Sequence, residues 1–232
     1  MKKTNLLCYL FIAFSSITLY GQDYYVKGME ELRFYERLNS QIDKRDFKQY
    51  DGITGSPYLY PGFKNAEVLT TDSTLYRGKL RYDMFADQME YKVKGGGIYW
   101  LANPERVVSI KIDTLKFIFY PEKKGKDKGT YYELLLDGKC RLLIKKGVLF
   151  KDAVQAKPYQ DPKPAEFTKR KDLFLLARSN APIQKIGKKK SVLTYLSDHS
   201  QELSAYIKQN QTSFIKAEDL KKLILFYNQL EK

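Results

Sequence analysis

Residues 131–144 read YYELLLDGKCRLLI, and they carry the strongest structural signal in the chain. Two runs of apolar, strand-favouring residues flank the dipeptide Asp137-Gly138. An Asp-Gly pair accepts the positive φ angles of a tight two-residue turn, so this arrangement is typical of a β-hairpin. The stretch therefore predicts two antiparallel strands, at 131–136 and 140–144.

The same pattern continues on either side of this hairpin. Apolar and polar residues alternate over several short runs, which gives each strand one buried and one wetter face. Turn residues separate the runs at short intervals, and such spacing favours antiparallel pairing over a parallel α/β arrangement. Further strands are expected at 80–84, 89–93, 108–112, 115–119 and 173–176. The proline-bearing segment 155–172 is interpreted as an exposed loop.

Helical patterns flank the β region. Apolar residues among charged ones predict a helix over 28–44. Near the carboxyl terminus, Asp198 and Gln201 resemble a capping pair, and an amphipathic stripe begins at Leu220. Short amphipathic helices cannot bury their stripes alone, so we expect them to pack on the sheet. The predicted fold is a β-rich α+β fold, an antiparallel meander, roll or small barrel-like sheet with a short N-terminal helix and a C-terminal helical tail.

The first residues have the pattern of a secretory signal peptide. Lys2 and Lys3 precede an uncharged, mainly apolar run, and Gly21 stands before a polar mature start. The run is short for a membrane helix, which needs about 20 mostly apolar residues, and an uncleaved anchor is the alternative. Cys8 lies early in the run, so lipoprotein processing is not expected. We predict a cleaved signal peptide and a periplasmic or secreted protein.

The chain is then expected to divide into a signal peptide at 1–21, a helical lead-in at 22–50, an antiparallel β domain at 51–187 and a helical tail at 188–232. Cleavage would leave Cys140 as the sole cysteine, so the mature protein cannot form an intramolecular disulfide. A buried structural thiol is the expected role of Cys140, and an intermolecular bridge is the alternative.

The chain is strongly basic, with a formal net charge of +14. Removal of Lys2 and Lys3 leaves 39 basic against 27 acidic residues, a charge of +12. Such a charge suggests a nucleic-acid partner in a cytosolic protein, but export argues against one. An envelope protein, a glycan or an anionic lipid headgroup is the expected partner, with solubility as the alternative explanation. The candidate basic residues are Lys169, Arg170, Lys171, Lys188, Lys189 and Lys190.

Aromatic residues gather in the first part of the β region. With nearby lysines they could form a face for sugar stacking or peptide binding. The alternative is that tyrosines simply suit half-buried strands. The aromatic binding candidates are Tyr58, Tyr60, Tyr99 and Trp100.

Catalytic patterns are weak. His199 is the only histidine, which excludes a multi-histidine zinc site. Its neighbours Asp198 and Ser200 could suggest a catalytic triad, but the side chains of a triad generally come from separate segments. Asp198 and Ser200 are therefore interpreted as helix caps. No cofactor is expected. Acids for a glycan hydrolase or lyase could be drawn from Asp83, Asp87 and Glu90, which are otherwise interpreted as solvated strand-end residues.

Several segments together resemble a group of uncharacterised secreted proteins of Gram-negative bacteria. They are 51–59, 78–83, 87–91, the hairpin at 132–143, 206–208 and 220–230. The resemblance implies an envelope address and an order of strands followed by helices, and it implies no activity and no site residue.

These patterns predict a non-catalytic exported envelope protein that binds another envelope component. A hydrolase or lyase acting on envelope glycans or glycolipids is the alternative, and peripheral binding to an anionic membrane through the lysine clusters is a third reading. A concave cleft with two of the carboxylates would favour the enzyme. A flat or convex aromatic and basic face, with the acids scattered, would favour the binding protein. The patterns predict no oligomeric state.

Overall fold

The structure is a computed structural model that describes residues 25–33, 50–95, 97–121, 129–156, 158, 161–179 and 181–230. The predicted signal peptide lies outside these residues. So does most of the helix predicted over 28–44, of which residues 29–33 are described and helical.

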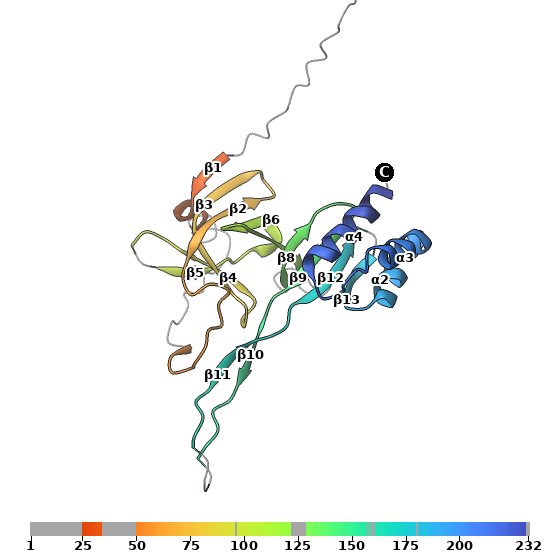
Figure 1. The fold of residues 1–232 in the computed structure, drawn as a ribbon. Helices are drawn as coiled ribbons and strands as arrows, with labels where there is room; N and C mark the ends of the chain where they lie inside the picture. The colour runs from red at the N-terminus through yellow and green to blue at the C-terminus, as the bar shows by residue number, and fades with distance from the viewer. Residues whose placement is uncertain are drawn as a thin grey trace, which may run out of the picture.

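Eleven strands of the described chain form one open sheet (Figure 1). Their order is β13-β12-β9-β8-β7-β6-β2-β3-β4-β5, with β1 beside β3. Neighbours on this path pair antiparallel, whereas β1 runs parallel to the first half of β3. The strands are β1 (Tyr25–Gly28), β2 (Lys64–Thr70), β3 (Thr74–Asp83), β4 (Gln88–Lys92), β5 (Ile98–Trp100), β6 (Val107–Ile112), β7 (Leu115–Pro121), β8 (Gly129–Leu136), β9 (Cys140–Lys145), β12 (Leu173–Arg178) and β13 (Ala181–Ile186).

Three α-helices of the described chain follow the strands. They are α2 (Lys189–Tyr195), α3 (Ser200–Gln209) and α4 (Ala217–Leu230), with short 3₁₀ turns at Pro104–Arg106 and Ser197–His199. Figure 1 shows these helices gathered at the β8, β9, β12 and β13 part of the sheet, away from β1 to β5. The predicted β-rich α+β class is therefore confirmed, as a sheet that stays open with β13 and β5 at its ends.

The hairpin predicted at 131–144 is confirmed as β8 and β9. Leu134 pairs with Leu143, and a register shift brings Leu136 opposite Leu142. Gly138 has a φ of +153°, and a β-carbon at this position would lie 2.5 Å from the Asn228 amide of α4. Glycine is therefore required both by the backbone conformation and by the close approach of the helix.

A two-sided hydrogen bond joins α4 to this hairpin. The Cys140 N–H donates to Asn228 Oδ1 at 2.8 Å, and Asn228 Nδ2 donates to the Cys140 carbonyl oxygen at 3.0 Å. Cys140 begins β9 next to the turn, where its backbone has no partner from β8 in the pairing register. The helix thus satisfies backbone groups that burial would otherwise leave unbonded.

One face of the sheet is lined by two successive cores. The first is built mainly from β2, β3, β4 and β6 and includes Val68, Leu80, Tyr91 and Ile110. The second lies under the helices, where Leu142 and Leu176 of the sheet belong to the same buried cluster as residues of α2, α3 and α4. This confirms the expectation that the helices bury their apolar stripes against the sheet.

Strands β10 (Val148–Lys151) and β11 (Glu166–Lys169) form a separate two-stranded ribbon. It projects away from the sheet in Figure 1. The interpretation of 155–172 as a plain exposed loop is therefore wrong for its second half, which contains β11. Phe167 explains the difference, because it is buried in the first core and packs edge-on against Tyr50 and Phe85, holding the ribbon at its base.

Candidate functional site

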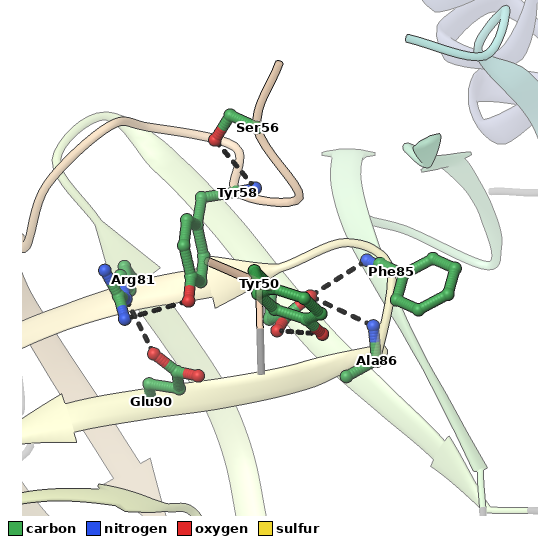
Figure 2. A network of polar contacts seen from close by, with 8 residues as sticks. Tyr50, Ser56, Tyr58, Arg81, Phe85, Ala86 and Glu90 are labelled. Atoms are coloured by element: carbon green, nitrogen blue, oxygen red, sulfur yellow. Dashed lines mark hydrogen bonds and ion pairs between the residues drawn. The ribbon is translucent and has the colours of Figure 1, made fainter. Parts of the chain in front are cut away.

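The three acids considered for catalysis lie on β3, on β4 and in the turn between them. Asp83, at the end of β3, is 0% exposed. One carboxylate oxygen accepts hydrogen bonds from the N–H groups of Phe85 and Ala86, each at 3.0 Å, and the other accepts one from the Tyr50 hydroxyl at 3.0 Å (Figure 2). Asp83 therefore organises the β3–β4 turn through one carboxylate oxygen and ties it to Tyr50 through the other.

Glu90 lies on β4 and is also 0% exposed. Its carboxylate pairs with Arg81 Nε at 2.6 Å. The Arg81 guanidinium lies between two rings, 3.7 Å from the centroid of Tyr58 and 4.5 Å from that of Phe63, and it also donates to the Tyr58 hydroxyl at 3.0 Å. Figure 2 shows Arg81 joined to both Tyr58 and Glu90. The interpretation of these acids as solvated strand-end residues is thus wrong for Asp83 and Glu90.

Asp87 belongs to a third polar cluster that joins the β3–β4 turn to β8 and β9. Lys145 Nζ lies 2.5 Å from its carboxylate, and the Tyr82 hydroxyl donates to the same oxygen at 2.6 Å. Lys145 also donates to the Tyr131 carbonyl oxygen at 3.2 Å. Burial lowers the pKa of Lys145, although Asp87 opposes this shift, and burial with the adjacent Asp87 raises the pKa of Tyr82. The cluster holds the turn against β9.

The residues around His199 do not form a catalytic triad. The Asp198 carboxylate accepts a hydrogen bond from the Tyr227 hydroxyl at 2.6 Å and pairs with Arg178 at 3.0 Å. His199 stands at the start of α3, where no side-chain cap is formed, and its ring packs edge-on against Tyr227. The interpretation of Asp198 as the cap of α3 is therefore wrong, because its carboxylate is directed to β12 and α4 instead.

The aromatic candidates lie in different environments. Tyr58 is half-buried and stacked on Arg81, and Tyr60 is half-buried with Lys64 Nζ 5.6 Å from its ring centroid. Tyr99 is only 8% exposed, in the first core, with its ring between Tyr91 and the Arg33 guanidinium. Trp100 is half-buried on the edge strand β5.

The two basic clusters approach the same end of the sheet. Residues 169–171 precede β12 and residues 188–190 follow β13, and the register pairs Phe174 with Ile186. Lys169 and Lys171 are exposed, as are Lys188, Lys189 and Lys190. Arg170 is half-buried, with its guanidinium against Gly147. Antiparallel pairing thus places these segments at one end of two adjacent strands, although they lie apart in the sequence.

A groove of about 610 Å³ lies between β13 and α2, next to the second cluster. Lys188 and Lys190 line it, and β13 adds Lys185. The other side chains at its wall come from Gln184, Ile186, Ser191, Thr194 and Tyr195, with no acid among them. Lys185 and Tyr195 were not identified from the sequence, because only the turn from β13 into α2 brings them together with Lys188.

Two further grooves differ in their charges. One, of about 520 Å³ near the β8–β9 turn, contains Arg141 and Arg178, which pair with Asp137 and Asp198. The other, of about 490 Å³ over β2, β3 and β6, has acids and bases together, including the Glu67–Arg77 ion pair. Neither these two grooves nor the one beside β13 is lined by Asp83, Asp87 or Glu90.

Comparisons with models of protein families, with curated proteins and with solved structures find no match. The resemblance to secreted proteins of Gram-negative bacteria therefore stays a prediction. Within the described ranges, no group of three or more metal-ligating side chains comes together, and none of the helices there has the length and apolar character needed to cross a membrane.

Proposed function

We propose that the protein is a non-catalytic, exported envelope protein that binds an acidic envelope component in the groove between β13 and α2. The observation that carries the proposal is a set of three exposed cations. Lys185, Lys188 and Lys190 line the groove, and none of them has an acidic partner among the described residues. Some basic side chains elsewhere are paired with acids, as Arg77 is with Glu67 and Arg81 with Glu90.

Three cations around one groove favour an anionic ligand, because an incoming negative charge relieves their mutual repulsion. The groove also offers the apolar surface of Ile186 and the ring of Tyr195. A ligand with both acidic and apolar groups would therefore be held by charge at the rim and by contact at the wall. A protein segment, an acidic glycan and an anionic lipid headgroup all fit this charge requirement, whereas export continues to argue against nucleic acid.

A hydrolase or lyase has less support. Asp83, Asp87 and Glu90 are each bound to side chains or backbone of their own domain. An acid engaged in this way is not directed toward a substrate, and general acid–base chemistry requires a carboxyl group within hydrogen-bond reach of one.

The proposal is tested with purified residues 22–232 and a fluorescently labelled oligoglutamate probe. We expect binding by anisotropy, and we expect the double variant Lys188→Glu/Lys190→Glu to weaken it at least about tenfold, since rim charges steer and hold an acidic partner. Raising the salt concentration should weaken binding further, because exposed charges are screened.

The matched control is Lys208→Glu/Lys222→Glu, which makes the same change in net charge at exposed positions on α3 and α4. If the control weakens binding as much as the groove variant, the overall charge of the protein is responsible and the proposed site is wrong. Titrations with a sulfated oligosaccharide and with anionic lipid vesicles, using the same variants, then identify the preferred class of acidic ligand.

A further inference from the structure

The strand beside this groove is an edge strand. Strand β13 is the last strand in the order of the sheet, and within the described chain its backbone pairs with β12 alone. An edge strand presents a row of N–H and C=O groups that no neighbouring strand satisfies. At Lys185 the carbonyl oxygen accepts a hydrogen bond from the Gln184 side chain at 3.0 Å, a contact that an incoming strand could replace.

The groove follows this edge. Three of its lining residues, Gln184, Lys185 and Ile186, belong to the second half of β13, and α2 forms the opposite wall. Helix α2 runs back along the strand, because the Tyr195 hydroxyl at its end accepts a hydrogen bond from the Arg178 N–H at the far end of β12. The groove therefore borders the second half of β13, a stretch of three residues that spans about 10 Å.

We propose that the groove takes an extended, acidic peptide segment of a partner protein, which pairs its backbone with β13 as an added strand. This inference rests on the proposed function and names the class of ligand. Backbone pairing supplies affinity in strand addition, and side-chain pockets supply specificity. Here the peptide side chains that point into the groove would face Lys188 and Lys190, which selects acidic residues, beside the apolar surface of Ile186 and Tyr195.

Two residues of β13 also fit an opposite role. Proline and lysine on an edge strand commonly prevent pairing with other chains, and β13 contains Pro182 and Lys185. Pro182 lacks an N–H group, but Ile183 to Ile186 keep theirs. Pro182 therefore limits pairing to the half of the strand that borders the groove. If the edge is only protected, no peptide will pair with it, and the experiment separates these two outcomes.

The test uses a labelled hexapeptide of alternating valine and glutamate, titrated against residues 22–232. Three matched peptides serve as controls. One carries lysine in place of glutamate. The other two carry N-methyl groups on every second backbone nitrogen, one peptide on the valine nitrogens and the other on the glutamate nitrogens. We expect the lysine peptide to bind at least about tenfold more weakly. We also expect the affinity of one N-methylated peptide to fall about tenfold or more and that of the other to stay within about twofold of the unmodified peptide. The reason is that only one edge of an added strand donates hydrogen bonds to β13.

The outcomes distinguish this inference from the proposed function. Equal binding of both N-methylated peptides, still weakened by Lys188→Glu/Lys190→Glu, would leave the acidic groove intact and overturn strand addition. Binding of the sulfated oligosaccharide or the vesicles, with no binding of the acidic hexapeptide, would likewise keep the groove and exclude a peptide ligand. Failure of every acidic probe would refute both. Hydrogen exchange gives an independent readout, in which the acidic hexapeptide should slow exchange of amides within Ile183 to Ile186.

Discussion

At the residue scale, the acids of this protein show how a buried charge can serve structure. Asp83 is inaccessible to solvent, yet it accepts hydrogen bonds from two backbone N–H groups and from the Tyr50 hydroxyl. A carboxylate placed in this way compensates its own burial, because hydrogen bonds to a charged group are stronger than neutral ones. The same acceptor satisfies the N–H groups of the turn that follows.

We therefore expect Asp83→Ala to lower the free energy of unfolding by about 2–4 kcal/mol. The substitution removes hydrogen bonds to a charged group and leaves two backbone N–H groups without an acceptor. Urea denaturation followed by circular dichroism measures this change. The control is Asp51→Ala, an exposed acid nearby, which should change stability by less than about 0.5 kcal/mol. Equal effects of the two substitutions would show that Asp83 does not organise the turn.

Cys140 has a second residue-scale consequence. Its side chain is 0% exposed in the second core, and burial raises the pKa of its thiol to about 12. The thiolate is the reactive species, so a buried thiol with a raised pKa reacts slowly. We expect residues 22–232 to show almost no reaction with a thiol reagent at pH 8 and to show complete reaction of one thiol in denaturant. Fast reaction of the folded protein would restore the intermolecular bridge as a possibility.

At the element scale, the local sequence pattern correctly predicted strands that pair with their neighbours in the sequence. The hairpin at 131–144 was predicted because its turn chemistry and its apolar runs agree within a few residues. Strand β1 was missed because four residues without clear alternation acquire strand geometry only by pairing with β3. Strand β11 was missed because nearby prolines suggest a loop, while Phe167 is fixed by contacts that come from distant segments.

The candidate groove illustrates the same limit. The lysines at 188–190 were predicted as a basic cluster from the sequence alone. Their cooperation with Lys185 and Tyr195 could not be predicted, because it depends on where β13 ends and how α2 folds back along it. For the same reason Asp198 was misinterpreted, since its partners Arg178 and Tyr227 lie on β12 and α4.

The contact of Asp198 with α4 leads to a prediction about the helical layer. Burial raises the pKa of Asp198, but hydrogen bonds from Tyr227 and the backbone and the charge of Arg178 outweigh it and hold the pKa below its usual value. A carboxyl group with a lowered folded-state pKa stabilises the fold above its unfolded pKa of about 4, and this contribution is lost as the pH falls below it.

Replacing Tyr227 with phenylalanine removes one of these hydrogen bonds while keeping the ring in the core. We expect Tyr227→Phe to cost about 1–3 kcal/mol at pH 7, the usual contribution of a hydrogen bond to a charged group, and to cost less at pH 3 as Asp198 becomes protonated. Denaturation curves at both pH values measure the two differences.

Tyr206→Phe, at a half-buried tyrosine on α3, is the control and should show no such dependence on pH. A cost that is equal at both pH values would mean that Asp198 does not couple α4 to the sheet.

At the scale of the whole molecule, one sheet combines a buried face with an edge at β13. One of its faces carries two buried clusters of apolar residues, the first mainly on β2, β3, β4 and β6 and the second under the helices. The Lys145–Asp87 contact connects the two halves, because it joins the β3–β4 turn to β9. Within the described chain, by contrast, the β13 edge pairs with no strand other than β12, and the exposed Lys185, Lys188 and Lys190 lie beside it. The proposed binding site thus lies apart from the two buried cores, so charge reversal at Lys188 and Lys190 should weaken the proposed binding without unfolding the protein.

The proposed partner class depends on where the protein resides, which makes export the last and most general prediction. We expect the full-length chain, produced in a Gram-negative host, to be recovered from the periplasm or medium with Gln22 as its first residue, because Lys2, Lys3 and the apolar run after them have the pattern of a signal peptide. Cell fractionation and N-terminal sequencing measure this. Lys2→Glu/Lys3→Glu should retain the precursor inside the cell, whereas Lys208→Glu/Lys222→Glu, the same charge change far from the N-terminus, should not.

Recovery of a chain that still begins at Met1 in the membrane fraction would indicate an uncleaved anchor. Recovery from the cytosol would remove the argument against nucleic acid, and the lysines beside β13 would then have to be tested against that polyanion first.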